Sequence, residues 1–196
     1  MKKKNYTSYI LTAIITVVGI FLITTYNSLV NKDEKVKLQA NEVQNAYQRR
    51  LDLIPNLVNV VKGVSDFEQN TLVEITNARS KAMTVNFNTT NKTADEFNKA
   101  NDAQNSLATA TNNLIISIEK YPVLKGSSAY AGLQTQLEGT ERRIKIARKD
   151  FNEAINVYNS AVRTFPTKLV AGIFGFNEKK GFKADEGAET ITEIKF

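Results

Sequence analysis

The most constraining feature of this sequence is a run of apolar and small residues that recur at alternating intervals of three and four. This spacing places side chains on one face of an α-helix, whereas a strand would need an interval of two. The run predicts a helix roughly 55–60 Å long, at about 1.5 Å per residue. One register holds large side chains and the other mostly small ones, so a second helix can approach closely. The residues are Tyr130, Leu133, Leu137, Thr140, Ile144, Ala147, Phe151, Ala154, Tyr158, Ala161 and Phe165.

The same rhythm marks a helix nearer the N-terminus. It passes through Pro55, and a proline inside a helix removes one hydrogen bond and usually kinks the helix. We therefore expect one long, kinked helix that can be continuous with the apolar segment before it. The alternative is a break, with Asp52 capping a new helix. The residues of this seam are Val36, Ala40, Val43, Tyr47, Arg50, Ile54, Leu57 and Val61.

Two further helical segments lie between these seams, over residues 66–85 and 93–120. The whole chain has only three prolines and nine glycines, which favours long helices. The predicted fold class is all-α, with an N-terminal transmembrane helix, a long antiparallel four-helix bundle over residues 26–176 and a mobile tail over residues 177–196. The expected inward residues are Phe67, Leu72, Ile75, Ala78, Ala82 and Met83, then Phe97, Ala100, Leu107, Leu114, Ile115 and Ile118.

The first 25 residues predict a membrane anchor. Residues 6–25 contain no charged side chain and follow a basic tip over residues 1–5. About 20 apolar residues cross a bilayer. A cleaved signal peptide would need a small-x-small site after the apolar core, and a buried core helix would show polar periodicity; neither is present. Three lysines and the α-amine precede the span, whereas Lys32, Lys35 and Lys37 follow it, interleaved with Asp33 and Glu34. This bias predicts a cytoplasmic N-terminus and an extracytoplasmic body.

Composition excludes several classes of site. The chain has no histidine and no cysteine, so the usual zinc, haem and iron–sulfur ligands and the Ser-His-Asp and Cys-His catalytic sets are missing. The net charge is +6, and three of the 26 basic residues stand in the N-terminal tip, which leaves +3 for the rest. A body so nearly balanced argues against a nucleic-acid surface. We predict no cofactor, no metal and no enzymatic activity.

A few charged residues are candidates for a functional site. Arg50 falls on the apolar seam of its helix, and a buried charge needs a partner. Glu141 and Arg148 share a line that flanks the seam of the C-terminal helix. One interpretation is a buried network that fixes helix register; the other is a partner or small-anion site lined by Arg50, Glu141 and Arg148. The full candidate set is Arg50, Asp52, Glu68, Arg79, Glu141 and Arg148.

The extreme C-terminus suggests a separate hypothesis. Residues 190–196 have a strand-like composition and end in Ile194-Lys-Phe196. Such a segment can add as a strand to a partner sheet or offer its carboxylate to a peptide-binding domain. The alternative is a frayed terminus, which is common at chain ends.

Several strings resemble the LemA family in order along nearly the whole chain. The most specific is Gln48-Arg-Arg-Leu-Asp-Leu-Ile-Pro-Asn-Leu-Val58. Two departures stand out: Asp66-Phe67-Glu68 replaces a stretch that often holds His-Glu, and Phe151 precedes Asn152 where the family often has Tyr. Further matching segments are Tyr26–Val30, Val61–Gly63, Ala78-Arg79, Glu119–Pro122, Leu133-Gln134, Leu137–Ile144, Ala147-Arg148, Tyr158-Asn159, Phe165-Pro166 and Phe174–Phe176.

The resemblance implies a bacterial, membrane-anchored helical bundle in the cytoplasmic membrane, without an established catalytic activity. One branch of the family is connected with magnetosome membranes, and other members are encoded beside membrane proteins. The expected function is therefore an envelope scaffold or adaptor for protein partners or membrane organisation, in contact with the lipid bilayer. An extracytoplasmic sensor that binds a small anion is the alternative. Neither the oligomeric state nor the identity of a partner follows from the sequence.

Overall fold

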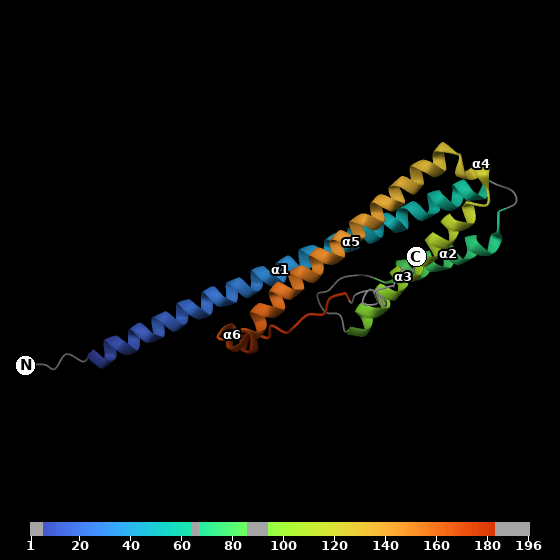
Figure 1. Cartoon of the computed structure of the whole chain (residues 1–196). Coiled ribbons are helices and arrows are strands. Elements are labelled where there is room, and N and C mark those ends of the chain that lie inside the picture. Colours follow the sequence, from blue (N-terminus) through green and yellow to red (C-terminus); the bar gives the residue numbers. More distant parts are fainter. Residues whose placement is uncertain (1–5, 64–66, 86–93, 183–196) are drawn as a thin grey trace, which may run out of the picture.

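The computed structural model describes residues 6–63, 67–85 and 94–182, and all regular elements within these ranges are helices. This confirms the all-α fold class. Figure 1 shows a long rod in which the N-terminal half of the first helix projects from the body. The elements are α1 (Tyr6–Lys62), α2 (Gln69–Thr84), α3 (Ala94–Ile118), α4 (Pro122–Lys125), α5 (Ser128–Arg163) and α6 (Thr167–Phe174).

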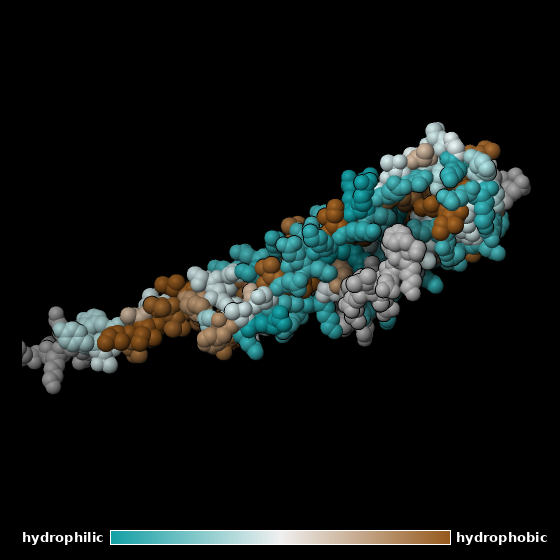
Figure 2. Space-filling model, in the orientation of Figure 1, coloured by the Kyte–Doolittle hydropathy of each residue, from teal (hydrophilic) through white to brown (hydrophobic). Residues whose placement is uncertain are grey.

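Helix α1 joins the apolar N-terminal segment to the body without interruption. It contains 57 residues and runs through Pro55, so the alternative of a break capped by Asp52 is wrong. Its first part is long and apolar enough to cross a membrane, and none of its most apolar window is buried against the rest of the chain. Figure 2 shows this segment as a narrow, hydrophobic extension of a largely hydrophilic rod.

The body consists of two antiparallel helix pairs. Helix α5 packs along the body half of α1, and α3 packs along α2. Helix α5 begins where the Ser127 hydroxyl accepts a 3.2 Å hydrogen bond from the Tyr130 backbone N–H, which caps the first turn. The α2–α3 pair covers mainly the end of α1 and α5 that lies farthest from the apolar segment (Figure 1).

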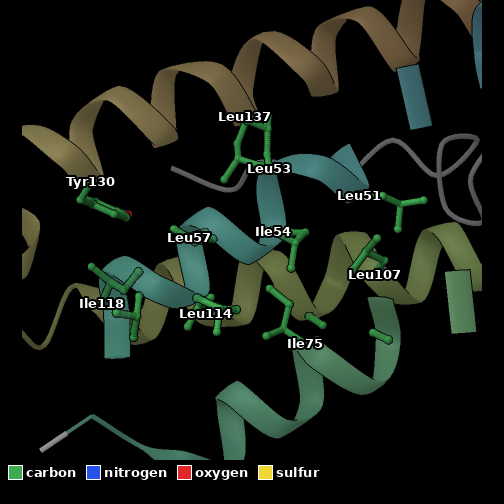
Figure 3. Close-up of a cluster of buried hydrophobic side chains, with 14 of the residues drawn as sticks. Leu51, Leu53, Ile54, Leu57, Ile75, Leu107, Leu114, Ile118, Tyr130 and Leu137 are labelled. Carbon is green, nitrogen blue, oxygen red and sulfur yellow. The ribbon is translucent and has the colours of Figure 1, made fainter. Parts of the chain in front are cut away.

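Two apolar clusters form the core. The distal cluster draws residues from α1, α2, α3 and α5, including Leu57, Ile75, Leu114 and Leu137 (Figure 3). The proximal cluster lies mainly between α1 and α5 and includes Val43 and Phe151. Residues at the predicted α1 seam are all buried, because the spacing of three and four keeps them facing α5. The pattern of the N-terminal seam therefore identifies the core face correctly.

Two details of the helices differ from the sequence-based expectation. Met83 is 57% exposed, because α2 ends one residue later and α3 covers only the face that carries Ala78 and Ala82. Phe165 is 77% exposed, because α5 ends at Arg163 and the chain turns away from the seam. A short helix, α6, follows at Thr167–Phe174.

The segment after α6 is folded along the body over residues 177–182. The expectation for this stretch is a mobile tail, whereas the structure holds it against α5 through side-chain hydrogen bonds. The remainder of the predicted tail, with Ile194 and Phe196, lies outside the described residues. We call residues 177–182 the strap.

Candidate functional site

A layer of polar side chains separates the two apolar clusters. It contains Arg50 from α1, Gln104 from α3, and Thr140 and Glu141 from α5. Arg50, Gln104 and Thr140 are at most 4% exposed. Each occupies a heptad position between a residue of the distal cluster and one of the proximal cluster along its own helix. We call these four residues the polar layer.

Arg50 is the centre of the polar layer. Its Nε and Nη2 donate to the two carboxylate oxygens of Glu141 at 2.8 and 2.7 Å, a bidentate pair. Its Nη1 donates to the backbone oxygen of Gln104 at 3.0 Å and lies 3.5 Å from the side-chain oxygen of the same residue. The guanidinium therefore links α1, α3 and α5. Glu141 is 39% exposed, so water still reaches one side of the pair.

This geometry brings together two of the three residues predicted to line an anion site. Arg148 lies one heptad from Glu141, and its guanidinium carbon is 4.5 Å from the centre of the Phe182 ring. Burial raises the pKa of Tyr47. The positive charges of Arg148 and Arg50 act against this rise, and the negative charge of Glu141 adds to it. The donors of Arg50 are directed to Glu141 and Gln104, so the arrangement suits a structural charge pair better than capture of an anion.

Arg79 donates a hydrogen bond to a main-chain carbonyl of α1. Pro55 has no N–H, so the carbonyl of Leu51, four residues earlier, loses its normal helical donor. The Arg79 Nε donates to this carbonyl at 3.0 Å from α2. A side chain from a neighbouring helix thus replaces the missing hydrogen bond, and the proline can remain inside an unbroken helix.

Two asparagines of α5 hold the strap. The side-chain amide of Asn159 exchanges two 2.8 Å hydrogen bonds with the backbone of Lys179. Asn152 pairs likewise with the backbone of Phe182, at 2.8 and 3.1 Å. The two asparagines are seven residues apart on a helix, roughly 10 Å, which matches three residues of extended chain. Phe182 is buried, with its ring 5.6 Å from that of Phe151.

A charge cluster holds the strap to α1. The Lys179 Nζ lies 2.8 Å from one carboxylate oxygen of Asp33, and Lys37 lies 3.0 Å from the other. Burial disfavours ionisation of Asp33, but the hydrogen bonds from Lys179 and Lys37 outweigh it, and the pKa of Asp33 is lowered from 3.8. Burial also raises the pKa of the nearby Tyr158, whose ring centre lies 5.3 Å from the Lys179 Nζ.

A groove of about 620 Å³ runs between α1 and α5 beside the polar layer. Its walls combine acidic and basic side chains with the exposed Ile146, which is 59% accessible. Asp52 lies at one end of the groove and accepts a 2.8 Å hydrogen bond from Gln48. The lining residues are Gln39, Glu42, Asn45, Ala46, Gln48, Arg49, Asp52, Arg143, Ile146, Ala147 and Asp150.

The remaining predicted residue, Glu68, lies apart from these features. It is exposed at the start of α2, where its side chain makes no capping hydrogen bond. Sequence reasoning missed Gln104 and the strap asparagines, although a signal was present for each. Gln104 continues the α3 heptad seam between Ala100 and Leu107, and both asparagines follow an aromatic core residue at an interval of seven.

Comparison with known proteins identifies the family. The LemA family model matches residues 39–196, which include the polar layer, the groove and the strap. The chain belongs to the LemA family. Protein LemA of Metamycoplasma hominis is 25% identical over 181 residues, covering 91% of this chain and 78% of that protein. The resemblance drawn from the Arg-Arg-Leu-Asp-Leu-Ile-Pro string is therefore confirmed.

Magnetosome proteins form a second group of relatives. Magnetosome protein MamQ 2 of Paramagnetospirillum magneticum and Magnetosome protein MamQ of Magnetospirillum gryphiswaldense are each 28% identical to this LemA-family chain over 88 residues. The match covers 45% of this chain and 32% of each magnetosome protein, about a third of their length. Together with the apolar start of α1, these similarities support a membrane-associated protein.

Proposed function

We propose that this LemA-family chain is a non-enzymatic, single-pass membrane protein whose body is an envelope scaffold or adaptor for protein partners. The observation that carries the proposal is the continuity of α1. One helix of 57 residues forms both the apolar segment and the central helix of the body. A partner bound to the body is then held at a fixed height above the bilayer, without a flexible linker.

The dimensions of α1 support this role. Residues 6–25 form about 30 Å of helix, which matches the hydrocarbon thickness of a bilayer. The groove residues contributed by α1, from Gln39 to Asp52, stand roughly 20–40 Å farther along the same helix. The groove offers charges of both signs and one exposed isoleucine, a mixture typical of the rim of a protein interface. We therefore propose that a partner protein contacts this groove.

Site-specific photocrosslinking in intact membranes tests this proposal. A photoreactive amino acid replaces Ile146 in the groove, and the matched control replaces Ile116, which is 62% exposed on α3. We expect one reproducible adduct that requires the probe at residue 146 and is weakened by the Arg143→Glu change beside it. Equal adducts from both positions, or none from residue 146, would argue against a partner site in the groove.

The orientation requires its own test. We propose that the N-terminus is cytoplasmic in a bacterial cytoplasmic membrane and that the body lies outside it, as the lysine bias favours. The natural chain has no cysteine, so Lys3→Cys and Lys125→Cys are unique labelling sites. A membrane-impermeant maleimide applied to intact spheroplasts should label residue 125 and not residue 3. The reverse pattern would require a cytoplasmic body.

The absence of catalysis is part of the same proposal. The names of the relatives are not enzyme names, and within the described ranges no three acidic side chains gather as a metal site. Turnover of a substrate by the purified chain, lost in Glu141→Gln, would overturn it. Stabilisation by a small anion that disappears in Arg148→Gln would instead favour the sensor alternative.

A further inference from the structure

Helix α6 forms an apolar surface beside the exit of the predicted membrane span. It packs against both α1 and α5 at the end of the body from which the apolar segment projects (Figure 1). Gly175 adopts a left-handed conformation with φ of 76° and ends the helix, so that Phe176 turns back toward α1. The ring of Tyr26 lies 4.9 Å from that of Phe174 and 5.7 Å from that of Phe176.

The two faces of α6 are both apolar, but only one is covered. Val170 and Ala171 are 1% exposed and contact the body. On the other side, Phe165, Leu169 and Ile173 are 77%, 61% and 73% exposed. Leu169 and Ile173 are spaced by four and share one line along α6, and Phe165 lies in the turn just before the helix. A row of large apolar side chains facing outward marks a contact surface rather than an ordinary solvated face.

We propose that α6 is an interfacial foot: Phe165, Leu169 and Ile173 insert into the headgroup region of the bilayer that α1 enters. The bilayer is the occupant that fits, because Tyr26 immediately follows the last residue of the span and α6 packs at its level. The apolar surface of the span continues toward α6 in Figure 2. Lys168, exposed on the same helix, can extend its ammonium group to lipid phosphates.

The foot gives the body a second contact with the membrane. A single spanning helix can tilt and rotate about its own axis, because lipid surrounds it evenly. When α1 is tilted, only one rotation about its axis lowers α6 into the bilayer surface, so an apolar helix on one side of α1 fixes the direction of the tilt. The foot thus fixes which side of the tilted α1–α5 rod faces the membrane surface. The inference rests on the membrane insertion that underlies the proposed function, but it is independent of any protein partner.

Tryptophan fluorescence of the full chain in lipid vesicles tests the foot. The natural chain has no tryptophan, so Ile173→Trp provides a single reporter that remains apolar. The vesicles contain phosphatidylcholine and phosphatidylglycerol, with bromine atoms either near the headgroup or deep in the acyl chains. We expect blue-shifted emission that is quenched more strongly by the shallow bromines. The distal control Val123→Trp, at a site 88% exposed on α4, should be red-shifted and unquenched.

A reporter within the span separates failure of the foot from failure of the anchor. Phe21→Trp should be quenched most strongly by the deep bromines. If Phe21→Trp is quenched and Ile173→Trp behaves like Val123→Trp, the foot is overturned while the anchor stands. If neither is quenched, both are overturned. Blue-shifted emission of Ile173→Trp that disappears when the protein-to-lipid ratio is lowered would mean contact with a second copy, which also overturns the foot.

Discussion

Arg50 and Leu51 are adjacent in α1, and each has a polar group whose partner comes from another helix. Arg50 carries a charge into a region that is almost closed to water, and the carbonyl of Leu51 loses its helical donor to Pro55. Glu141 of α5 pairs with the Arg50 guanidinium, and Arg79 of α2 donates to the Leu51 carbonyl. Both partners are distant in sequence: Arg79 is 28 residues from Leu51, and Glu141 is 91 residues from Arg50.

The buried charge pair leads to a prediction about stability. Glu141→Ala leaves the guanidinium of Arg50 with Gln104 alone, and removing one partner of a buried pair usually costs about 3–5 kcal/mol. Because Glu141 is partly exposed, we expect about 2 kcal/mol in denaturant unfolding of the full chain in detergent micelles. Arg50→Met combined with Glu141→Met should recover most of the loss. The exposed control Glu138→Ala should change stability little, and an equal loss there would contradict the prediction.

The replacement hydrogen bond predicts coupling between Arg79 and Pro55. Arg79→Met should destabilise the natural protein by about 1 kcal/mol, because the Leu51 carbonyl is left without a donor. In a Pro55→Ala background the alanine N–H can reach this carbonyl, so the same change should cost less. A double-mutant cycle from unfolding free energies measures the difference. Additive effects would show that Arg79 acts independently of the proline.

At the scale of elements, the heptad spacing predicts the helices well and their contacts less well. The α1 and α5 seams are correct over most of their length because burial follows directly from helical periodicity. The seam of α3 contains Gln104 and Thr111, and their polarity conceals a regular interval. The strap itself is harder to predict, because it is held by its backbone, which pairs with the amides of Asn152 and Asn159, and not by a periodic set of its own side chains.

Two glycines provide opposite predictions for the α5–strap element. A Cβ on Gly181 would lie 2.5 Å from Oδ1 of Asn152, which is fixed by its pairing with Phe182. Gly181→Ala should therefore loosen the strap and raise hydrogen exchange at residues 179–182. Gly139 lies inside α5, and a Cβ added there would meet no neighbouring atom within 4 Å. Gly139→Ala should stabilise the chain by about 0.5–1 kcal/mol, and a stabilising Gly181→Ala would contradict the described strap.

The Asp33–Lys179 contact predicts loss of strap stability in acid. The pKa of Asp33 is lowered in the folded protein, since the hydrogen bonds from Lys179 and Lys37 outweigh the effect of burial. Its contribution is therefore complete above the unfolded pKa near 3.8 and is lost as pH falls through the lower folded value. The thermal midpoint of the natural chain should exceed that of Asp33→Asn at pH 6, and the difference should shrink below about pH 4. A difference that is constant with pH would exclude this linkage.

At the scale of the whole molecule, the polar layer addresses an ambiguity that the seams create. A heptad seam with repeated large and small residues allows α5 to pack on α1 in registers seven residues apart. In the observed register Arg50 meets Glu141. A shift of one heptad would bring Arg148 to this position, where two like charges repel, or Gln134, which cannot neutralise the guanidinium. Only the observed register pairs Arg50 with an acid.

An apolar layer in place of the polar one should cost specificity of register rather than stability. Replacing Arg50, Gln104 and Glu141 together by leucine removes the buried charges and fills the layer, so the unfolding free energy should stay equal or rise. Spin labels at Asn41→Cys on α1 and Lys145→Cys on α5 then report the register by electron–electron distance measurement. The natural layer should give one distance, whereas the leucine variant should add a population displaced by about 10 Å along the axis, the rise of seven residues. A single unchanged distance would mean that the loops between the helices and the apolar packing are sufficient to fix the register. The polar layer would then not be what aligns α5 with α1.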